Sequence, residues 1–578
     1  MLSDEILLCT RKPGQYIGQE WNVSRKDFDK AGIRFALCFP DLYEIGMSNI
    51  GIRIVYDVLN KIDDVACERV FSPDKDMEEA LRSRNLPLSS LESGRGLKEF
   101  DMIGFSLGYE LLYTNVLNIL DLADIPFASS ERDAKFPLII GGGPCVLNPE
   151  PIAEFFDLFV IGEAEEVIVE IMAVYRKSKD RYRSGELSKQ DLLISLAQIE
   201  GIYVPSLYKV SYDSEGHILK MEPCVENVPE KIRKRYIKDL DKSPYPLDWL
   251  VPYVQVVHDR ASLELARGCP NACRFCQARS QYYPYRIRRK DTLIDHACEL
   301  YKRTGYDEIS LGGLSVSDYP GLEELLITLT GLFKAKAVSL SLPSVKAKTM
   351  LGKASEIIAS IKKTGLTFAP EAGTEKMRGI LNKDFNAEEF FKVLEQSYAA
   401  GYQHVKLYYM TGLPEEETSD LDGIADFTYA VSQARRKVNL GPAQVNISIN
   451  TLIPKPHTAF ERLAMDSLET IAWKQNYLRD KMKNRRFKLN FHNRQMSFME
   501  GVFSRGDRRL GKVIVNAFRK GARFDAWSSY FNFERWMEAF RETEERPEFY
   551  LRKIPKEEIL PWDLIDLGVE KETVYPPS

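Results

Sequence analysis

Short apolar runs alternate with helix-length amphipathic stretches in two long parts of the chain, and this alternation restricts the possible folds most strongly. Strands that alternate with helices predict parallel sheets covered on both faces, so we expect an α/β fold. The runs are RFALCF, MIGFSL, PLII and LFVIG in residues 32–175, and SLELAR, EISLGG, VSLSLP, LTFAPE, HVKLYYM and VNISINTL in residues 251–460.

The two series predict two different architectures. The strands and helices of residues 32–175 are typical of a doubly wound, flavodoxin-like or Rossmann domain, which binds ligands beyond the carboxyl ends of its strands. Six strand–helix repeats in residues 251–460 predict a partial (β/α)6 barrel, because a complete barrel has eight. Barrels of this kind also carry their active sites at the carboxyl ends of the strands.

The rest of the chain shows weaker patterns. Residues 1–31 form an N-terminal extension. Residues 176–250 are charged, poorly periodic and closed by prolines, which predicts a linker. Residues 461–578 contain aromatic helical segments such as WSSYFNFERWMEAFRE, so we expect a mainly helical C-terminal region.

Composition excludes several classes of protein. The 578 residues include 79 Lys and Arg against 84 Asp and Glu, and the resulting net charge of −5 opposes a basic coat for nucleic acid. No apolar run approaches the roughly 18 residues of a membrane helix, and no secretory signal is visible at the start. Nine cysteines, three of them clustered, fit a reducing compartment better than a disulfide scaffold. We expect a soluble, cytoplasmic enzyme without a membrane partner.

The clustered cysteines have metal-ligand spacing. Cys269, Cys273 and Cys276 follow the first apolar run of the second series as C-x3-C-x2-C. A tight loop with this spacing can bring three thiolates to three irons of one cubane, whereas an ordinary [4Fe–4S] electron carrier needs a fourth. Three ligands leave one iron open to a substrate or cofactor, as in a catalytic zinc site. The alternative, a zinc knuckle, lacks a fourth Cys or His nearby, since Cys298 is the next cysteine and lies in a helical pattern.

The loop resembles that of the radical S-adenosylmethionine (SAM) superfamily, which has this cysteine spacing, an aromatic residue before the last cysteine and a partial barrel. The resemblance implies that Cys269, Cys273 and Cys276 hold a [4Fe–4S] cluster whose open iron chelates SAM. It implies that one electron then cleaves SAM to a 5′-deoxyadenosyl radical, and that Phe275 lies near the adenine.

Other segments resemble later elements of the same superfamily. Gly312 and Gly313 stand where a glycine pair would contact the SAM amino group, although the usual acidic residue after the pair is absent. Glu371 and Gly373 resemble an E-x-G element of the fourth strand. KLYYMTGLP, which contains Gly412, resembles the element that flanks the adenine, and NISINTLIPKPHT resembles the sixth-strand element. From the residues alone, the glycine pair could instead permit a tight turn and Glu371 could cap a helix.

The first series resembles a cobalamin-binding domain, whose pattern is D-x-H-x-x-G, then S-x-L, then G-G. The resemblance implies that these segments bind cobalamin, with glycines that let the backbone approach the nucleotide tail. Tyr43 replaces the histidine that would ligate cobalt, and a phenol is a poor ligand at neutral pH, so either cobalt lacks a protein ligand or the domain has lost the cofactor. A flavodoxin-like domain with purely structural glycines is the alternative. The matching residues are Asp41, Tyr43, Gly46, Ser106, Gly141, Gly142 and Gly143.

Two basic stretches could bind anions. Residues 479–494 carry seven Lys or Arg among aromatic residues, which suits nucleic acid, but the balanced total charge favours a solvated helix face. SRGDRRLGK, residues 504–512, could bind a small anionic substrate or form a structural ion-pair network.

Over nearly the whole chain, the motifs resemble one group of B12-binding-domain radical SAM proteins. The resemblance implies reductive cleavage of SAM with cobalamin, for methylation or another radical modification of an unknown substrate, with flavodoxin or ferredoxin as electron donor. Two alternatives stay open. One is a cobalamin-independent radical SAM enzyme, for example a methylthiotransferase acting on RNA. The other is a nucleic-acid-binding protein with a structural or redox-sensing cluster, and nucleic acid is the less favoured partner.

Overall fold

The structure is a computed structural model that describes residues 3–342, 366–399, 401–438 and 441–575. It divides into two compact units, which we describe separately. The first contains Met1–Asp259, Val502–Tyr550 and Pro555–Val569, and the second contains Arg260–Gly501, Leu551–Ile554 and Glu570–Ser578.

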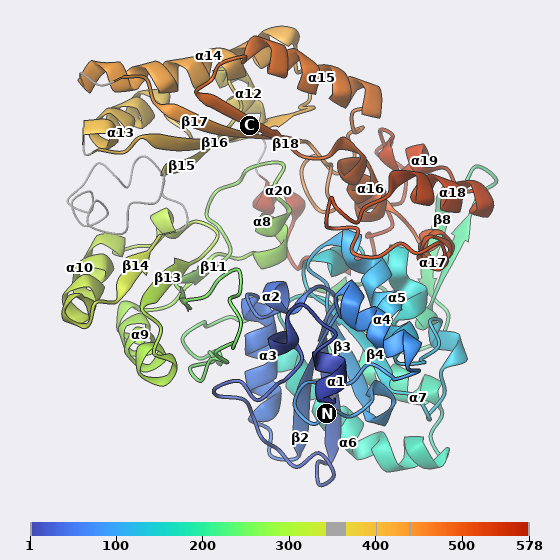
Figure 1. The fold of residues 1–578 in the computed structure, drawn as a ribbon. Helices are drawn as coiled ribbons and strands as arrows, with labels where there is room; N and C mark the ends of the chain where they lie inside the picture. Colours follow the sequence, from blue (N-terminus) through green and yellow to red (C-terminus); the bar gives the residue numbers. More distant parts are fainter. Residues whose placement is uncertain (1–2, 343–365, 400, 439–440, 576–578) are drawn as a thin grey trace. The chain divides into compact units, whose positions relative to one another are not determined.

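The first unit is built on a six-stranded sheet of order β2-β1-β3-β4-β5-β6, in which only the β5–β6 pair is antiparallel (Figure 1). The order of its five parallel strands is that of flavodoxin-like folds. Successive strands are added toward one edge up to β2 and toward the other edge from β3 onward, so the switch point lies between β1 and β3. The predicted α/β fold is therefore confirmed for this unit, and its strand order is the one that a doubly wound domain has. The strands are β1 (Ile33–Phe39), β2 (Val65–Phe71), β3 (Met102–Ser106), β4 (Leu138–Gly142), β5 (Leu158–Val160) and β6 (Ile202–Tyr203), and the helices include α3 (Ile50–Asn60), α4 (Lys75–Ser83), α5 (Tyr113–Leu122), α6 (Ala164–Ser184) and α7 (Lys189–Ala197).

Strand β2 was not expected, because its sequence VACERVF carries two charges. Both charged side chains are buried and paired. Arg69 forms ion pairs with Glu20 at 2.7 Å and Glu92 at 2.6 Å, and Glu68 accepts a hydrogen bond from Ser93 at 2.6 Å. Buried charges of this kind depend on their partners, so the apolar pattern alone could not reveal the strand.

Residues 176–250 differ from the predicted linker, because they belong to the first unit. They contain the end of α6, helix α7 and strand β6, followed by an antiparallel hairpin of β7 (Tyr208–Tyr212) and β8 (Ile218–Pro223). Strand β9 (Ile232–Arg233) then pairs with β19 (Ile565–Asp566) near the end of the chain.

The second unit contains the six predicted strands of the partial barrel. Among the described residues these six strands and a seventh, β18 (Phe487–Phe491), form two parallel sheets, of order β10-β13-β14 and β15-β16-β17-β18. The last residue of the predicted VSLSLP run, number 343, lies outside the described residues. The strands are β10 (Ala261–Glu264), β13 (Glu308–Gly312), β14 (Ser339–Ser341), β15 (Leu366–Glu371), β16 (His404–Thr411) and β17 (Gln444–Thr451).

The C-terminal region, which we expected to be mainly helical, contains several helices and is divided between the two units. Its first part adds α15 (Leu468–Lys481) and the parallel strand β18 (Phe487–Phe491) to the second unit. Helices α17 (Leu510–Arg519) and α18 (Phe533–Thr543) belong to the first unit, and α20 (Lys571–Val574) to the second. None of the described helices combines the length and hydropathy needed to cross a membrane.

Candidate functional site

The three clustered cysteines lie together in the second unit, in the loop between β11 (Ala266–Arg267) and α8 (Gln277–Tyr282). The loop follows β10, so it leaves the carboxyl end of the first strand as predicted. Each cysteine is half-buried and carries a free thiol. The sulfurs are thus shielded from solvent without being enclosed.

Hydrogen bonds to the backbone fix the shape of this loop. The Arg279 guanidinium donates to the carbonyls of Cys269 and Asn271, both at 2.8 Å. The Tyr575 hydroxyl donates to the carbonyl of Cys276 at 2.6 Å. The loop is therefore held at both outer cysteines by side chains of its own unit.

The middle of the loop is tied to the segment that follows helix α12 (Glu375–Ile380). Arg274 donates its backbone N–H to the Leu381 carbonyl and its guanidinium to the Ile380 carbonyl, both at 3.0 Å. The Asn382 amide donates to the Ala272 carbonyl, also at 3.0 Å. The fourth strand region and the cysteine loop therefore form one local structure.

The surroundings of the sulfurs suit metal-bound thiolates. The Asn271 amide donates to the Cys269 sulfur at 3.3 Å. Burial raises the pKa of Cys273 to about 11 and also raises the pKa of Cys276, while the charge of Lys383 opposes both shifts. Metals bind the deprotonated thiol, so a cation at this site would supply the charge that stabilises buried thiolates.

The donor set consists of three thiols from one loop. A cubane cluster needs one thiolate on each of several irons. The three loop cysteines can supply these thiolates, so the residues present fit a [4Fe–4S] cluster with one iron left without a protein ligand.

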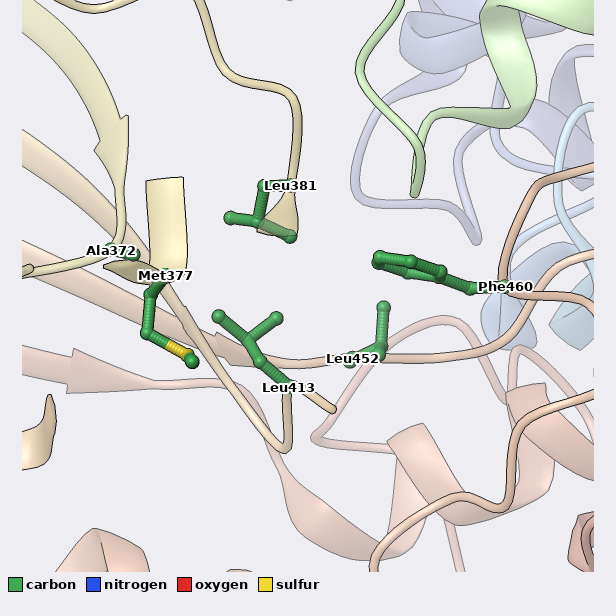
Figure 2. Packing of buried hydrophobic residues seen from close by; sticks show 6 residues of the cluster. All are labelled: Ala372, Met377, Leu381, Leu413, Leu452 and Phe460. Carbon is green, nitrogen blue, oxygen red and sulfur yellow. The ribbon is translucent and has the colours of Figure 1, made fainter. Parts of the chain in front are cut away.

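Phe275 packs against an apolar cluster at the carboxyl ends of β15, β16 and β17. Figure 2 shows the six buried members of this cluster converging from separate segments. The predicted contact of Phe275 with adenine stays a prediction, and the cluster provides an apolar wall next to the cysteine loop. Its members are Ala372, Met377, Leu381, Leu413, Leu452 and Phe460.

Glu371 ends β15 beside Lys383, which the sequence did not single out. The Lys383 ammonium donates to the Glu371 carboxylate at 3.2 Å, and the charges of both act on the Cys273 thiol. Burial raises the pKa of Glu371, and Lys383 opposes this shift. Glu371 also has a φ of 64°, in the left-handed region that non-glycine residues rarely adopt. Strain of this kind is often kept at functional sites.

The reason for glycine differs among the four barrel positions. Gly312 ends β13 and Gly313 follows it, before the turn that leads to residues 316–318, and neither glycine has a positive φ. A Cβ on Gly373 would lie 2.2 Å from the backbone of Gly423 in α14 (Thr418–Ala434), so this glycine permits close packing. Gly412 has a φ of 83° and donates its N–H to Glu416 at 2.9 Å, which makes it a turn residue.

In the first unit, the position predicted for the cobalt ligand lies in the interior. Tyr43 is 2% exposed, and its hydroxyl donates to Glu20 at 2.8 Å. Burial raises the pKa of Tyr43, so its phenol stays protonated. Asp41 is also buried and accepts a hydrogen bond from the Trp527 indole at 2.9 Å. Both side chains therefore contact their own chain.

At three of the four glycine positions in this region, packing or backbone conformation explains why the residue is glycine. A Cβ on Gly46 would lie 2.2 Å from the Phe71 ring, and one on Gly141 would lie 2.4 Å from the Phe159 ring. Gly143 has a φ of 107°. A Cβ on Gly142 would meet a single atom at 3.9 Å, so packing does not require glycine there, and Gly142 pairs with half-buried Ser106 on β3.

Residues 502–550 contact the loops that follow β1, β3 and β4. Besides the Trp527–Asp41 bond, Phe524 donates its N–H to Asn115 at 2.8 Å, and Asn148 donates to the carbonyls of Ser504 and Gly506 at 3.0 and 2.9 Å. The chain itself thus occupies much of the edge that the resemblance gives to cobalamin. The residues present do not fit a protein-ligated cobalamin.

The structure bears differently on the predictions made for the two basic stretches. Arg508 pairs with Glu150 at 2.6 Å, and Arg509 pairs with Asp507 at 2.7 Å, so SRGDRRLGK contributes to a structural ion-pair network. Residues 479–494 contain the end of α15 and strand β18, which is not the solvated helix face that we favoured. Their predicted contact with nucleic acid stays a prediction.

Comparisons with known proteins identify the class of both domains. Residues 263–428 match the model of the radical SAM superfamily, and residues 51–205 match the model of radical SAM proteins, N-terminal. No model of a B12-binding domain matches. The chain therefore carries radical SAM domains, and these support an enzyme.

Individual relatives add little beyond this assignment. The uncharacterized protein MJ0966 of Methanocaldococcus jannaschii is 28% identical over 481 residues, which cover 83% of this chain and 90% of that protein. The radical SAM methyltransferase TsrM of Kitasatospora setae has a TM-score of 0.47 at 13% identity, over 88% of this chain and 99% of that one. The cobalamin-dependent SAM radical enzyme OxsB has a TM-score of 0.48 at 12% identity, over 90% and 71%. We base no inference on likenesses at these TM-scores.

Proposed function

We propose that this protein is a radical SAM enzyme that holds a [4Fe–4S] cluster through Cys269, Cys273 and Cys276 and cleaves SAM reductively. The observation that carries the proposal is the grouping of three free thiols in one braced loop of the domain that matches the radical SAM superfamily. When bound, such a cluster supplies the electron that cleaves SAM to methionine and a 5′-deoxyadenosyl radical.

The protein's own residues would bind and orient the cluster and SAM, and they would exclude water from the site. Asn271 donates to the Cys269 sulfur and so helps to set the properties of the thiolate. Lys383 is a half-buried cation near the cysteines and is suited to hold the carboxylate of SAM, with Glu371 as the acceptor for its amino group. The apolar cluster beside Phe275 keeps water away from this part of the site.

Cobalamin and the substrate are separate questions. The resemblance favours cobalamin and a methyl or other radical transfer, but Tyr43 and Asp41 contact their own chain. The proposed cleavage of SAM therefore rests on the second unit alone. The corrinoid content of the anaerobically purified protein tests the cobalamin proposal independently.

The experiment that tests the proposed function compares Cys269→Ala with Cys298→Ala. Cys298 is a half-buried thiol in helix α9 (Lys290–Thr304), outside the loop, and is the matched control. After anaerobic reconstitution and reduction, we expect wild type and Cys298→Ala to hold about four irons per chain and to form 5′-deoxyadenosine from SAM. Cys269→Ala should lose the product. Undiminished SAM cleavage by Cys269→Ala would refute the assignment.

A further inference from the structure

In the sheet of order β15-β16-β17-β18, three neighbouring strands share one polar face whose side chains are half-buried or exposed. Lys406 on β16, Asn446 on β17 and Lys488 on β18 are neighbours in register and form one row across three strands. Two residues further along, Tyr408, Ser448 and Asn490 form the next row, and Asn450 follows on β17. None of these side chains is buried, and Asn446, Asn450, Lys488 and Asn490 are exposed. We call these seven residues the polar face.

The opposite face of the same strands is a packed core. The alternate residues of β16 and β17 are buried, and helix α14 contacts both strands on that side, as Figure 1 shows. Phe487 of β18 contacts the ring of Tyr429, which belongs to α14. The side-chain alternation of a strand therefore places the seven residues of the polar face on the side away from α14.

A polar face is unusual at this place in a barrel. The inner face of barrel strands is ordinarily filled by branched apolar residues that form a core. Here amides, hydroxyls and ammonium groups take these positions, and all of them lose hydration if they are buried without partners. A ligand that offers hydrogen bonds and negative charge satisfies them without that loss.

The charge of the polar face favours an anion. Lys406 and Lys488 form no ion pair with any residue that the structure describes, and Lys406 lies over the Tyr408 ring at 4.6 Å. The acid at the end of the neighbouring strand, Glu371, is already bound by Lys383. Two lysines thus flank Asn446 without a carboxylate on β16, β17 or β18 to neutralise them.

We propose that the polar face binds the substrate of this enzyme and that the substrate carries an oxyanion, either phosphate or carboxylate, held by Lys406 and Lys488. The proposal rests on the proposed function, because the bound ligand is a substrate only if the protein is a radical SAM enzyme. The ligand would lie on the barrel sheet whose strand ends adjoin the cysteine loop. Asn446, Ser448 and Asn490 supply hydrogen bonds that fix the orientation of the bound molecule.

The test is a direct binding measurement on the full chain, both as purified and with its cluster reconstituted. Inorganic pyrophosphate and citrate are the two probes, and isothermal titration calorimetry at low and high salt is the readout. The variant is Lys406→Gln with Lys488→Gln. The control is Lys392→Gln with Lys302→Gln, which removes the same charge from the exposed surfaces of α13 (Ala387–Ala399) and α9.

We expect wild type and control to bind one probe in a salt-sensitive manner, and the Lys406/Lys488 variant to bind it about tenfold or more weakly, because charge-assisted hydrogen bonds are lost. The probe that binds better identifies phosphate or carboxylate. Equal binding by the variant, or no binding of either probe by folded wild type, overturns the proposal. Cleavage of SAM by the same wild-type preparation is scored separately, so failure of the proposed function and failure of this inference give different results.

Discussion

The hydroxyl of Tyr575 donates a hydrogen bond to the backbone carbonyl of Cys276 at 2.6 Å, across 299 positions of sequence. The same hydroxyl lies 2.9 Å from that of Ser280, and the Arg279 guanidinium donates to the neighbouring Val574 carbonyl. The end of the described chain is thus part of the structure that shapes the cysteine loop.

Replacing Tyr575 by Phe should loosen this loop while leaving the fold intact. One hydrogen bond to the Cys276 carbonyl is lost, which costs about 1 kcal/mol, and the buried ring is kept. We expect faster loss of iron to a chelator from the reconstituted variant. Tyr477→Phe is the control, because it removes a hydroxyl that donates to Asp422 elsewhere in the unit. Equal rates of iron loss in both variants would contradict a role for Tyr575.

Replacing Lys383 by Met should impair the use of SAM more than the assembly of the cluster. The substitution removes the cation beside Glu371 but touches none of the cysteines. We expect normal iron content. The KM for SAM should rise about tenfold, because one charged contact with SAM is lost. Lys376→Met is the matched control, because Lys376 pairs with Asp420 on an exposed surface of α12. An unchanged KM in the Lys383 variant would show that this lysine does not contact SAM.

Sequence patterns predicted the elements whose stability depends on apolar burial. The runs of the partial barrel all became strands because their alternate residues are buried, as β16 illustrates with Val405 and Leu407. Strand β2 was not predicted because Arg69 is buried by pairing with distant acids. Strand β18 was not predicted because FKLNF lies within a basic stretch. Long-range ion pairs and half-exposed edge strands leave no periodic signal.

The candidate site was predictable only where its residues are close in sequence. The spacing of Cys269, Cys273 and Cys276 was enough to propose a metal site, and the structure places all three in one loop. Lys383 reaches Glu371 only because α12 turns the chain back, and Tyr575 reaches Cys276 only through the folded C-terminal segment. Conversely, most of the glycines that resembled a cobalamin pattern have packing causes that a motif cannot distinguish from ligand contact.

Asp525 should make the stability of the protein depend on pH. Its carboxyl group accepts hydrogen bonds from Thr114 at 2.7 Å and Trp536 at 3.2 Å, and burial raises its pKa from 3.8 to about 6. The folded state therefore binds this proton more tightly than the unfolded state. The stabilising contribution is complete below pH 3.8 and is lost as pH rises to about 6, by about 3 kcal/mol in total.

Asp525→Asn should remove this dependence, because an amide cannot ionise. We expect the difference in unfolding free energy between variant and wild type to shift in favour of the variant as pH rises from 4 to 6. Urea unfolding at a series of pH values measures it. A difference that is constant over this range would show that the carboxyl group titrates normally in the folded protein.

Tyr43→Phe separates a structural role of Tyr43 from a role as cobalt ligand. The hydroxyl donates to Glu20, which Arg69 also binds, so its removal should lower the free energy of unfolding by about 1–2 kcal/mol. We expect the corrinoid content per chain, and the absorption spectrum of any bound corrinoid, to be the same in wild type and variant after anaerobic purification from cobalamin-fed cells. A spectral change in the Phe variant alone would place the phenol on cobalt, against the buried position found here. Absence of corrinoid from both, with SAM cleavage intact, would mean that the first unit serves the enzyme without cobalamin, as expected for an edge already occupied by residues 502–550.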